Sequence, residues 1–92
     1  MLKLRYSSQF KKDYKLAKRR CLPVSELKDI IIRLCNEEAL ETKYHDHALE
    51  GEWKDFRECH IRPDWLLIYR IAQDELLLVA QRTGSHSDLF GK

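Results

Sequence analysis

Three strand-like segments separated by very short turns constrain the fold of this chain more than any other feature. The segments cover 53–61, 65–72 and 75–82, so the turns between them contain only three and two residues. Connections this short join antiparallel neighbours, because parallel strands need a long crossover. The last segment is apolar on both faces, which favours a central strand covered by helices, although a short buried helix would give the same pattern. The three segments therefore predict an antiparallel meander.

The N-terminal third predicts a strand followed by two helices. Residues 2–7 alternate apolar and polar side chains, and either serine of the pair at 7–8 can cap a helix after them. The apolar stripes of the two helices are Phe10, Tyr14, Ala17 and Cys21 in the first, and Val24, Leu27, Ile31 and Leu34 in the second. Leu22-Pro23 ends the first helix, and the second begins near Pro23 or Ser25 and ends near Glu38.

Together these elements predict an α+β fold of order β-α-α-β-β-β, in which two N-terminal helices pack on an antiparallel sheet. Residues 39–51 lack periodicity and are expected to form a surface loop, and the polar tail after Arg82 is expected to add no strand. With 92 residues and 43% hydrophobic content, the whole chain (1–92) is expected to be a single domain, monomeric when free.

Composition and cysteine spacing restrict the cellular setting. The apolar runs are far shorter than the roughly 20 residues of a membrane span, and the N-terminus has no signal-peptide pattern, so we expect a cytoplasmic protein. The cysteines are Cys21, Cys35 and Cys59. They are odd in number and widely separated, which favours reduced, packed thiols over a disulfide framework. Cys59-His60, beside His45 and His47, matches no common zinc-site spacing. We therefore expect neither a metal nor an organic cofactor.

Positive charge is concentrated near the N-terminus. Residues 1–20 carry eight Lys or Arg side chains and one acid, Asp13, whereas the rest of the chain has an acidic excess. The basic residues expected to face away from the apolar stripe of the first helix include Lys11, Lys15, Lys18 and Arg19. They are a candidate surface for a polyanion such as RNA. The alternative is an ordinary solvated, lysine-rich helix.

The meander also brings polar side chains to one edge of the sheet. The end of its first strand, the start of the second and the end of the third meet at the same rim. The residues at these positions are His60, Asp64, Trp65 and Arg82. His86 follows Arg82 in the tail and reaches the same edge. Each residue also has an ordinary explanation, such as turn chemistry for Asp64, core packing for Trp65 and an ion pair for Arg82.

Two histidines, a carboxylate and an arginine are the groups that metal-free cleavage of RNA by its own 2′-hydroxyl requires. The reaction needs a base for the 2′-hydroxyl, an acid for the departing 5′-oxygen and positive charge on the phosphate. Histidine can make both proton transfers near neutral pH, and a guanidinium grips phosphate in bidentate fashion. The rings of Trp65 and Phe90 can stack on or flank a base.

The segments "HDHALEGEWKDFRECHIRPDWLLIYRI" and "RTGSHSDLF" resemble the YafQ branch of the RelE-type toxins of bacterial toxin–antitoxin systems. The resemblance covers residues 44–90 densely, and the strand and two helices expected in 1–38 agree with it in order. It implies two helices on an antiparallel sheet and a metal-independent endoribonuclease that cuts mRNA, usually in the ribosomal A site. It also implies mRNA, ribosomal RNA and a neutralising cognate antitoxin as partners.

Carried over by motif position, the resemblance implies functional roles for His47, His60, Asp64, Arg82, His86 and Phe90. Glu58 and Trp65 also fall at active-site positions of the family. His47 lies at the far end of the first meander strand from His60, so the 39–51 loop must fold back for it to take part. His45 departs from the family pattern and is taken as a surface residue.

The expected roles combine these residues with the rim chemistry. His60 is expected to be the base, oriented by Asp64 or Glu58, and Arg82 is expected to hold the phosphate. His86 or His47 would be the acid, with His86 favoured by topology. Two other functions remain compatible with the sequence: a non-nucleolytic toxin of the same fold that acts on a protein such as DNA gyrase, and a simple RNA-binding module.

Overall fold

The computed structural model describes residues 1–91 and contains three α-helices and five strands in that range. In chain order the strands are β1 (Lys3–Tyr6), β2 (His47–Ala48), β3 (Arg57–Arg62), β4 (Trp65–Ala72) and β5 (Leu77–Gly84). The helices are α1 (Ser8–Arg19), α2 (Val24–Cys35) and α3 (His86–Phe90), and short 3₁₀ turns lie at Thr42–Tyr44, Gly51–Trp53 and Gln73–Glu75. The predicted order is therefore confirmed, with β2 and α3 as additions. None of these helices has the length and apolarity to cross a membrane.

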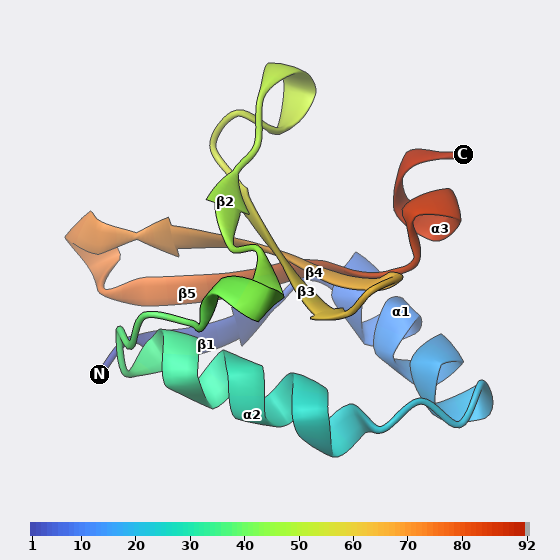
Figure 1. The fold of residues 1–92 in the computed structure, drawn as a ribbon. Helices are drawn as coiled ribbons and strands as arrows, with labels where there is room; N and C mark the ends of the chain where they lie inside the picture. The colour runs from blue at the N-terminus through green and yellow to red at the C-terminus, as the bar shows by residue number, and fades with distance from the viewer. Residues whose placement is uncertain (92) are drawn as a thin grey trace.

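The strands form one mixed sheet in the order β1-β5-β4-β3-β2 (Figure 1). β3, β4 and β5 are the predicted meander, since both of their pairings are antiparallel. β1 instead runs parallel to β5, with Lys3 opposite Leu77 and Tyr6 opposite Ala80. The expectation of a purely antiparallel sheet is wrong at this edge, because the connection through the helices is long enough for a crossover. β5 lies inside the sheet between β1 and β4, which agrees with its apolar sequence, but the central strand of the five is β4.

α1 and α2 pack on one face of the sheet and close the main core (Figure 1). Ser7 caps α1, since its hydroxyl accepts a hydrogen bond from the Phe10 amide at 2.9 Å. The buried members of the predicted stripes are Phe10, Ala17, Leu27, Ile31 and Leu34. Both helices are therefore confirmed, although α2 ends at Cys35 rather than near Glu38, because Glu37 adopts a left-handed φ of 58°.

Cys21 lies outside the core, contrary to the expectation for all three thiols. α1 ends at Arg19, and Cys21 adopts a left-handed φ of 60° in the turn that follows, where it is exposed. Cys35 and Cys59 are buried as predicted, and burial raises the pKa of both thiols. These two residues pack as small apolar side chains.

The segment before β3 differs most from the prediction. A 3₁₀ turn occupies the start of the predicted first meander strand, so β3 begins at Arg57 instead of Trp53. Trp53 lies in this 3₁₀ turn and packs edge-on against Phe56, with ring centroids 5.2 Å apart. The 39–51 loop folds back along β3 and adds the short strand β2 to the edge of the sheet.

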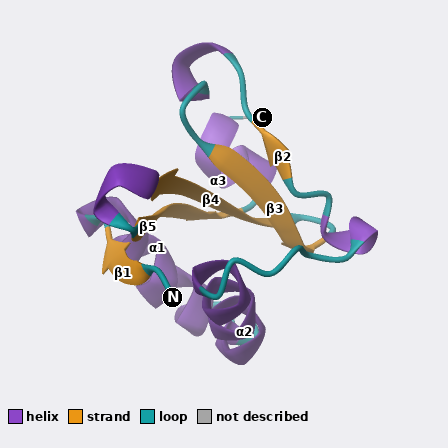
Figure 2. Ribbon diagram, turned by 90° about the vertical axis from the view of Figure 1, so that its left-hand side faces the viewer, coloured by secondary structure: helices purple, strands orange, loops and turns teal. Residues whose placement is uncertain are grey.

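The face of the sheet opposite α1 and α2 carries a second, smaller apolar cluster, and α3 and the loop around β2 lie on this side (Figures 1 and 2). Its buried members are Leu66, Ile68 and Leu89, with Leu49, Trp53, Phe56 and Phe90 packed around them. α3, which the sequence did not predict, begins with a capping box. Ser85 accepts a hydrogen bond from the Asp88 amide, and the Asp88 carboxylate accepts one from the Ser85 amide. The candidate site lies on this face.

Candidate active site

The carboxylate of Glu58 is the centre of a histidine cluster on β3. Side chains alternate along a strand, and since Cys59 faces the main core, Glu58 and His60 point to the opposite face. Glu58 is 5% exposed, and its Oε1 lies 3.4 Å from Nε2 of His60. β2 places His47 directly opposite Glu58, where its Nε2 lies 3.6 Å from the same oxygen. One buried carboxylate oxygen therefore faces two imidazoles.

The backbone of the loop determines which nitrogen of His47 carries hydrogen. Nδ1 lies 2.6 Å from the carbonyl oxygen of His45. A carbonyl can only accept, so Nδ1 is the donor and Nε2 is the atom that faces Glu58. The 39–51 loop therefore folds back toward β3, as a role for His47 requires.

Asp46 anchors this loop to the body of the protein. Its Oδ1 accepts a hydrogen bond from the Tyr69 hydroxyl at 2.6 Å and another from Arg57 Nε at 3.3 Å. Tyr69 is 1% exposed, and burial, with the hydrogen bond to Asp46, raises its pKa, so the hydroxyl stays a donor. His47 is the next residue, and these bonds hold it opposite Glu58. No pattern in the sequence predicted this role for Asp46.

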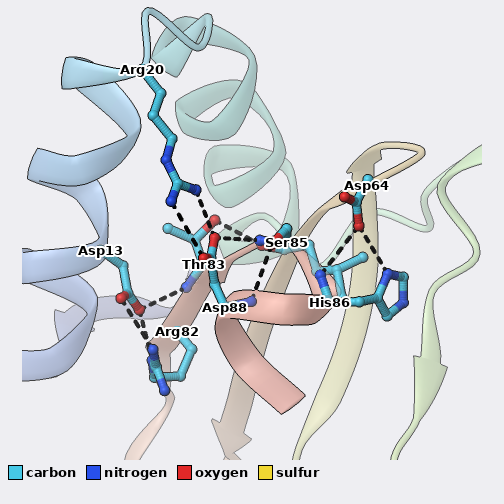
Figure 3. A network of polar contacts seen from close by, with 9 residues as sticks. Asp13, Arg20, Asp64, Arg82, Thr83, Ser85, His86 and Asp88 are labelled. Atoms are coloured by element: carbon cyan, nitrogen blue, oxygen red, sulfur yellow. Dashed lines mark hydrogen bonds and ion pairs between the residues drawn. The ribbon is translucent and has the colours of Figure 1, made fainter. Parts of the chain in front are cut away.

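The turn between β3 and β4 holds His86 at the start of α3 (Figure 3). Asp64 Oδ1 accepts a hydrogen bond from the His86 backbone amide at 3.2 Å and lies 3.1 Å from its Nδ1. These bonds, the backbone one foremost, lower the pKa of Asp64 from its ordinary value. An ionised carboxylate only accepts, so Nδ1 of His86 is the donor and Nε2 remains for chemistry.

His60 and His86 face one another across the site, with ring centroids 5.7 Å apart. Phe90 borders His86, and its ring centroid lies 6.3 Å from that of His86 and 6.4 Å from that of Trp53. The predicted site residues that come together here are His47, Glu58, His60, Asp64, His86 and Phe90.

Three of these side chains also form a donor set for a metal ion. The ligand atoms of Glu58, His60 and His86 all lie within 4.8 Å of one another. Two imidazole nitrogens and a carboxylate oxygen suit zinc or copper. Metal binding would compete with acid–base chemistry at these imidazoles, because a ring nitrogen that coordinates a metal cannot accept a proton.

Arg82 does not reach this cluster. Its Nε and Nη2 donate to the Asp13 carboxylate at 2.7 and 3.2 Å, and the Thr83 amide donates to the same carboxylate at 3.2 Å. Figure 3 shows Arg82 turned toward Asp13 on α1, apart from Asp64 and His86. The Asp13 side chain is only 10% exposed, so it needs a cationic partner, and Arg82 supplies one.

Trp65 belongs to the main core rather than to a surface that RNA can reach. It is 3% exposed and lies on the same face of β4 as Leu67 and Tyr69, under the helices. A ring in this position is not available for stacking on a base, which the sequence analysis expected as one role for it.

The predicted basic residues lie on the other side of the sheet from the histidines. Lys11, Lys15, Lys18 and Arg19 are exposed on α1, which packs on the opposite face (Figure 1). They cannot contact a nucleotide bound at Glu58 directly. They form instead a separate basic surface on α1.

His45 is a second residue near the site for which the sequence predicted no role. Its ring lies 5.4 Å from that of His60, in an edge-on arrangement of 64°. All four histidines of the chain therefore gather around Glu58 and His60. No local pattern marks His45, because it lies in a left-handed conformation at the end of the 3₁₀ turn, before β2 begins.

Comparisons with known proteins identify the family and confirm the fold. The family described as "Bacterial toxin of type II toxin-antitoxin system, YafQ" matches residues 2–91. The chain is 43% identical over 89 residues to the "mRNA interferase toxin YafQ" of Escherichia coli K12, covering 96% of this chain and 95% of that protein.

Two solved structures extend the similarity to three dimensions. A metal-bound toxin from Helicobacter pylori is 43% identical, with a TM-score of 0.93 over 98% of this chain and 100% of that one. The toxin in the E. coli DinJ-YafQ complex is 42% identical, with a TM-score of 0.89 over 99% of this chain and 100% of that one. The α+β fold is thus confirmed, and the chain belongs to the YafQ family of toxins of bacterial type II toxin–antitoxin systems.

Proposed function

We propose that this YafQ-family toxin is an endoribonuclease that cleaves mRNA, without a metal ion, through attack of a ribose 2′-hydroxyl on the adjacent phosphate. The observation that carries the proposal is the meeting of two histidine–carboxylate pairs, Glu58 with His60 and Asp64 with His86. Two imidazoles supply the base and the acid that the reaction needs. The name mRNA interferase, which E. coli YafQ carries, supports the same activity.

In the proposed reaction His60 removes the proton of the 2′-hydroxyl, and the freed oxygen attacks phosphorus. Glu58 faces Nε2 of His60, which favours hydrogen on that nitrogen and leaves Nδ1 as the basic atom. His86 donates a proton from Nε2 to the departing 5′-oxygen. The bond from phosphorus to the 2′-oxygen forms as the bond to the 5′-oxygen breaks, which gives a 2′,3′-cyclic phosphate and a 5′-hydroxyl.

We expect substrate binding to widen the gap between His60 and His86. Their ring centroids lie 5.7 Å apart, whereas a phosphate between the rings needs a hydrogen bond of about 2.8 Å on each side plus its own width. The His86 side chain is 47% exposed and that of His60 is 20% exposed, so His86 has more room to move. His47, on the other side of Glu58, is the alternative acid.

We also infer a cognate antitoxin, mRNA and ribosomal RNA as partners, in the cytoplasm. The E. coli DinJ-YafQ complex supports the antitoxin. The basic surface on α1 supports a contact with ribosomal RNA, because it leaves the opposite face, with the histidines, open to mRNA. A ribosome with mRNA in its A site offers both kinds of RNA at once.

Incubation of the purified chain with naked mRNA, and with mRNA on programmed ribosomes, tests the proposal. We expect cuts with 2′,3′-cyclic phosphate and 5′-hydroxyl ends, with or without EDTA, and a folded but inactive His60→Gln control. Loss of cleavage on chelation would overturn the metal-free reaction. RNA that is bound but not cut, or growth arrest with intact mRNA and inhibited gyrase, would favour the alternative functions.

A further inference from the structure

The proposed reaction uses His60 and His86, with His47 as the alternative acid, and His45 has no part in it. His45 is exposed, and its ring lies 5.4 Å from that of His60. The ring of His60 thus contacts His45 as well as His86. This position next to the proposed base suggests a role for the His45 ring. The residues around His45 indicate what the ring can bind.

A cleft of about 540 Å³ is lined by both His60 and His45. Its other lining includes Lys43, Tyr44, Arg62 and Glu26. The volume is within the range of about 300–1,000 Å³ that small-molecule sites occupy. The cleft is therefore large enough for one nucleoside, and it opens directly onto the proposed base.

The groups along this cleft are those that bind single-stranded RNA. Lys43 and Arg62 supply positive charge, and Tyr44 and His45 supply flat rings. Glu26 accepts two hydrogen bonds from Arg62, at 3.2 and 2.6 Å, and this pairing lowers the pKa of Glu26. The acid thus fixes the guanidinium at the edge of the cleft.

The backbone holds the His45 ring in place before any ligand arrives. His45 has a left-handed φ of 47°, its amide donates to the Thr42 carbonyl at 3.0 Å, and its own carbonyl accepts from His47. A left-handed conformation at a residue other than glycine is uncommon and costs free energy, so it often marks a functional position. The same residue positions His47 through its backbone and borders the cleft with its side chain.

We propose that this cleft binds the nucleoside on the 5′ side of the scissile phosphate, with its base against the His45 ring and its 2′-hydroxyl at His60. The inference rests on the proposed function, because it takes His60 as the base that activates that hydroxyl. The nucleoside on the 3′ side then lies toward His86 and Phe90. His45 would be a specificity-determining residue for the base before the cut.

The test combines a variant with substrates that lack one base. His45→Asn is suitable because asparagine tolerates the left-handed conformation and keeps the carbonyl that orients His47. The substrates carry an abasic ribose, which retains its 2′-hydroxyl, on either the 5′ or the 3′ side of the cut. Lys54→Gln, at an exposed lysine outside the cleft, is the matched control.

We expect the 5′-abasic substrate to lower kcat/KM of the unmodified protein and of Lys54→Gln by about 5- to 100-fold, as loss of one stacked base does. His45→Asn should lose a similar factor on intact RNA and little more on the 5′-abasic substrate, because one contact can be lost only once. The assignment would be overturned, without affecting the proposed function, if the losses from His45→Asn and from the 5′-abasic substrate multiplied. It would also be overturned if His45→Asn failed to add to the loss from the 3′-abasic substrate instead. Absence of RNA cleavage by the unmodified protein would overturn the proposed function and the assignment with it.

Discussion

Asp64 and His86 are 22 residues apart in the sequence, yet Asp64 Oδ1 lies 3.2 Å from the backbone nitrogen and 3.1 Å from Nδ1 of His86. The contact joins the β3–β4 turn to the start of α3. It therefore fixes both the position of the imidazole and the nitrogen that carries hydrogen. The Asp64 side chain is 72% exposed, so the pair contributes little to global stability and acts mainly on the site.

We expect Asp64→Asn to slow RNA cleavage by about 10- to 100-fold, while leaving the urea concentration at the midpoint of unfolding almost unchanged. The amide carries no charge to stabilise an imidazolium, and its NH₂ group can turn toward Nδ1 and favour the wrong tautomer. Single-turnover cleavage and urea unfolding measure the two effects. Asp74→Asn, an exposed acid in the turn between β4 and β5, is the control. Equal losses in both variants would mean that Asp64 acts only through surface charge.

The assignment of acid and base can be tested with an RNA whose 5′-oxygen leaving group is replaced by sulfur. A thiolate needs little protonation, so a protein without its acid should recover on this substrate. We expect His86→Gln to regain most of its rate and His60→Gln to regain almost none. Rescue of His47→Gln would instead make His47 the acid, and rescue of His60→Gln would exchange the two roles.

Periodic signals were sufficient for most of the fold. The apolar stripes predicted α1 and α2, and the short turns predicted the antiparallel pairing of β3, β4 and β5. The parallel pairing of β1 could not be predicted, because alternation in residues 2–7 specifies a strand but not its neighbour. α3 depends on the capping box of Ser85 and Asp88, within a tail too short to show helical periodicity.

The site could be predicted where topology alone determined it. The meander placed His60 and Asp64 at one rim, but the loop that supplies His47 has no periodicity, and its course depends on the bond from Tyr69 to Asp46, 23 residues away. Long-range side-chain bonds of this kind leave no local pattern in the sequence. His45 is exposed, as predicted, but the course of the loop that brings its ring to 5.4 Å from that of His60 could not be predicted for the same reason.

Metal ions should inhibit the reaction through the donor set of Glu58, His60 and His86. A transition metal bound there would occupy nitrogen lone pairs that proton transfer requires. We expect micromolar Cu²⁺ or Zn²⁺ to slow cleavage, EDTA to restore it, and Glu58→Gln to weaken metal binding measured by calorimetry. Stimulation of cleavage by either ion would contradict the metal-free mechanism.

The ion pair between Arg20 and Asp88 links α1 to α3 and should make stability depend on acid pH. The hydrogen bond from Arg20, followed by that from the Ser85 amide, lowers the pKa of Asp88 from 3.8 to about 2. Because the folded-state value is the lower one, the ionised carboxylate stabilises the fold above about pH 4, and this contribution is lost as the pH falls through about 2. We expect Asp88→Asn to lower the free energy of unfolding by up to about 1 kcal/mol at pH 7 and by progressively less toward pH 2.

Denaturant unfolding of both chains at pH 7, 4 and 2 measures this difference. Asp55→Asn, at an exposed acid before β3, is the control for a general loss of negative charge. A destabilisation by Asp88→Asn that stays constant down to pH 2 would show that ionisation of Asp88 is not its cause.

Arg82 is held by Asp13 through hydrogen bonds of 2.7 and 3.2 Å, so a role on the phosphate requires the guanidinium to exchange one anion for another. Two roles for Arg82 give different expectations. If it binds the phosphate, removal of Asp13 frees it for that purpose. If it only ties β5 to α1, removal of either partner should have the same effect.

We expect Arg82→Gln and Asp13→Asn to lower the free energy of unfolding by similar amounts, about 1–3 kcal/mol, because each leaves a largely buried charged group without its partner. Only Arg82→Gln should lose cleavage, by about 100-fold, because Asp13→Asn keeps the positive charge that stabilises the transition state. Measurement of kcat/KM at a temperature well below the Tm of each variant separates the loss of activity from the loss of stability. Equal losses of activity in the two variants would mean that Arg82 only positions β5. The positive charge on the phosphate would then come from another cation near the histidines, and Lys43 in the His45 cleft is the first to test.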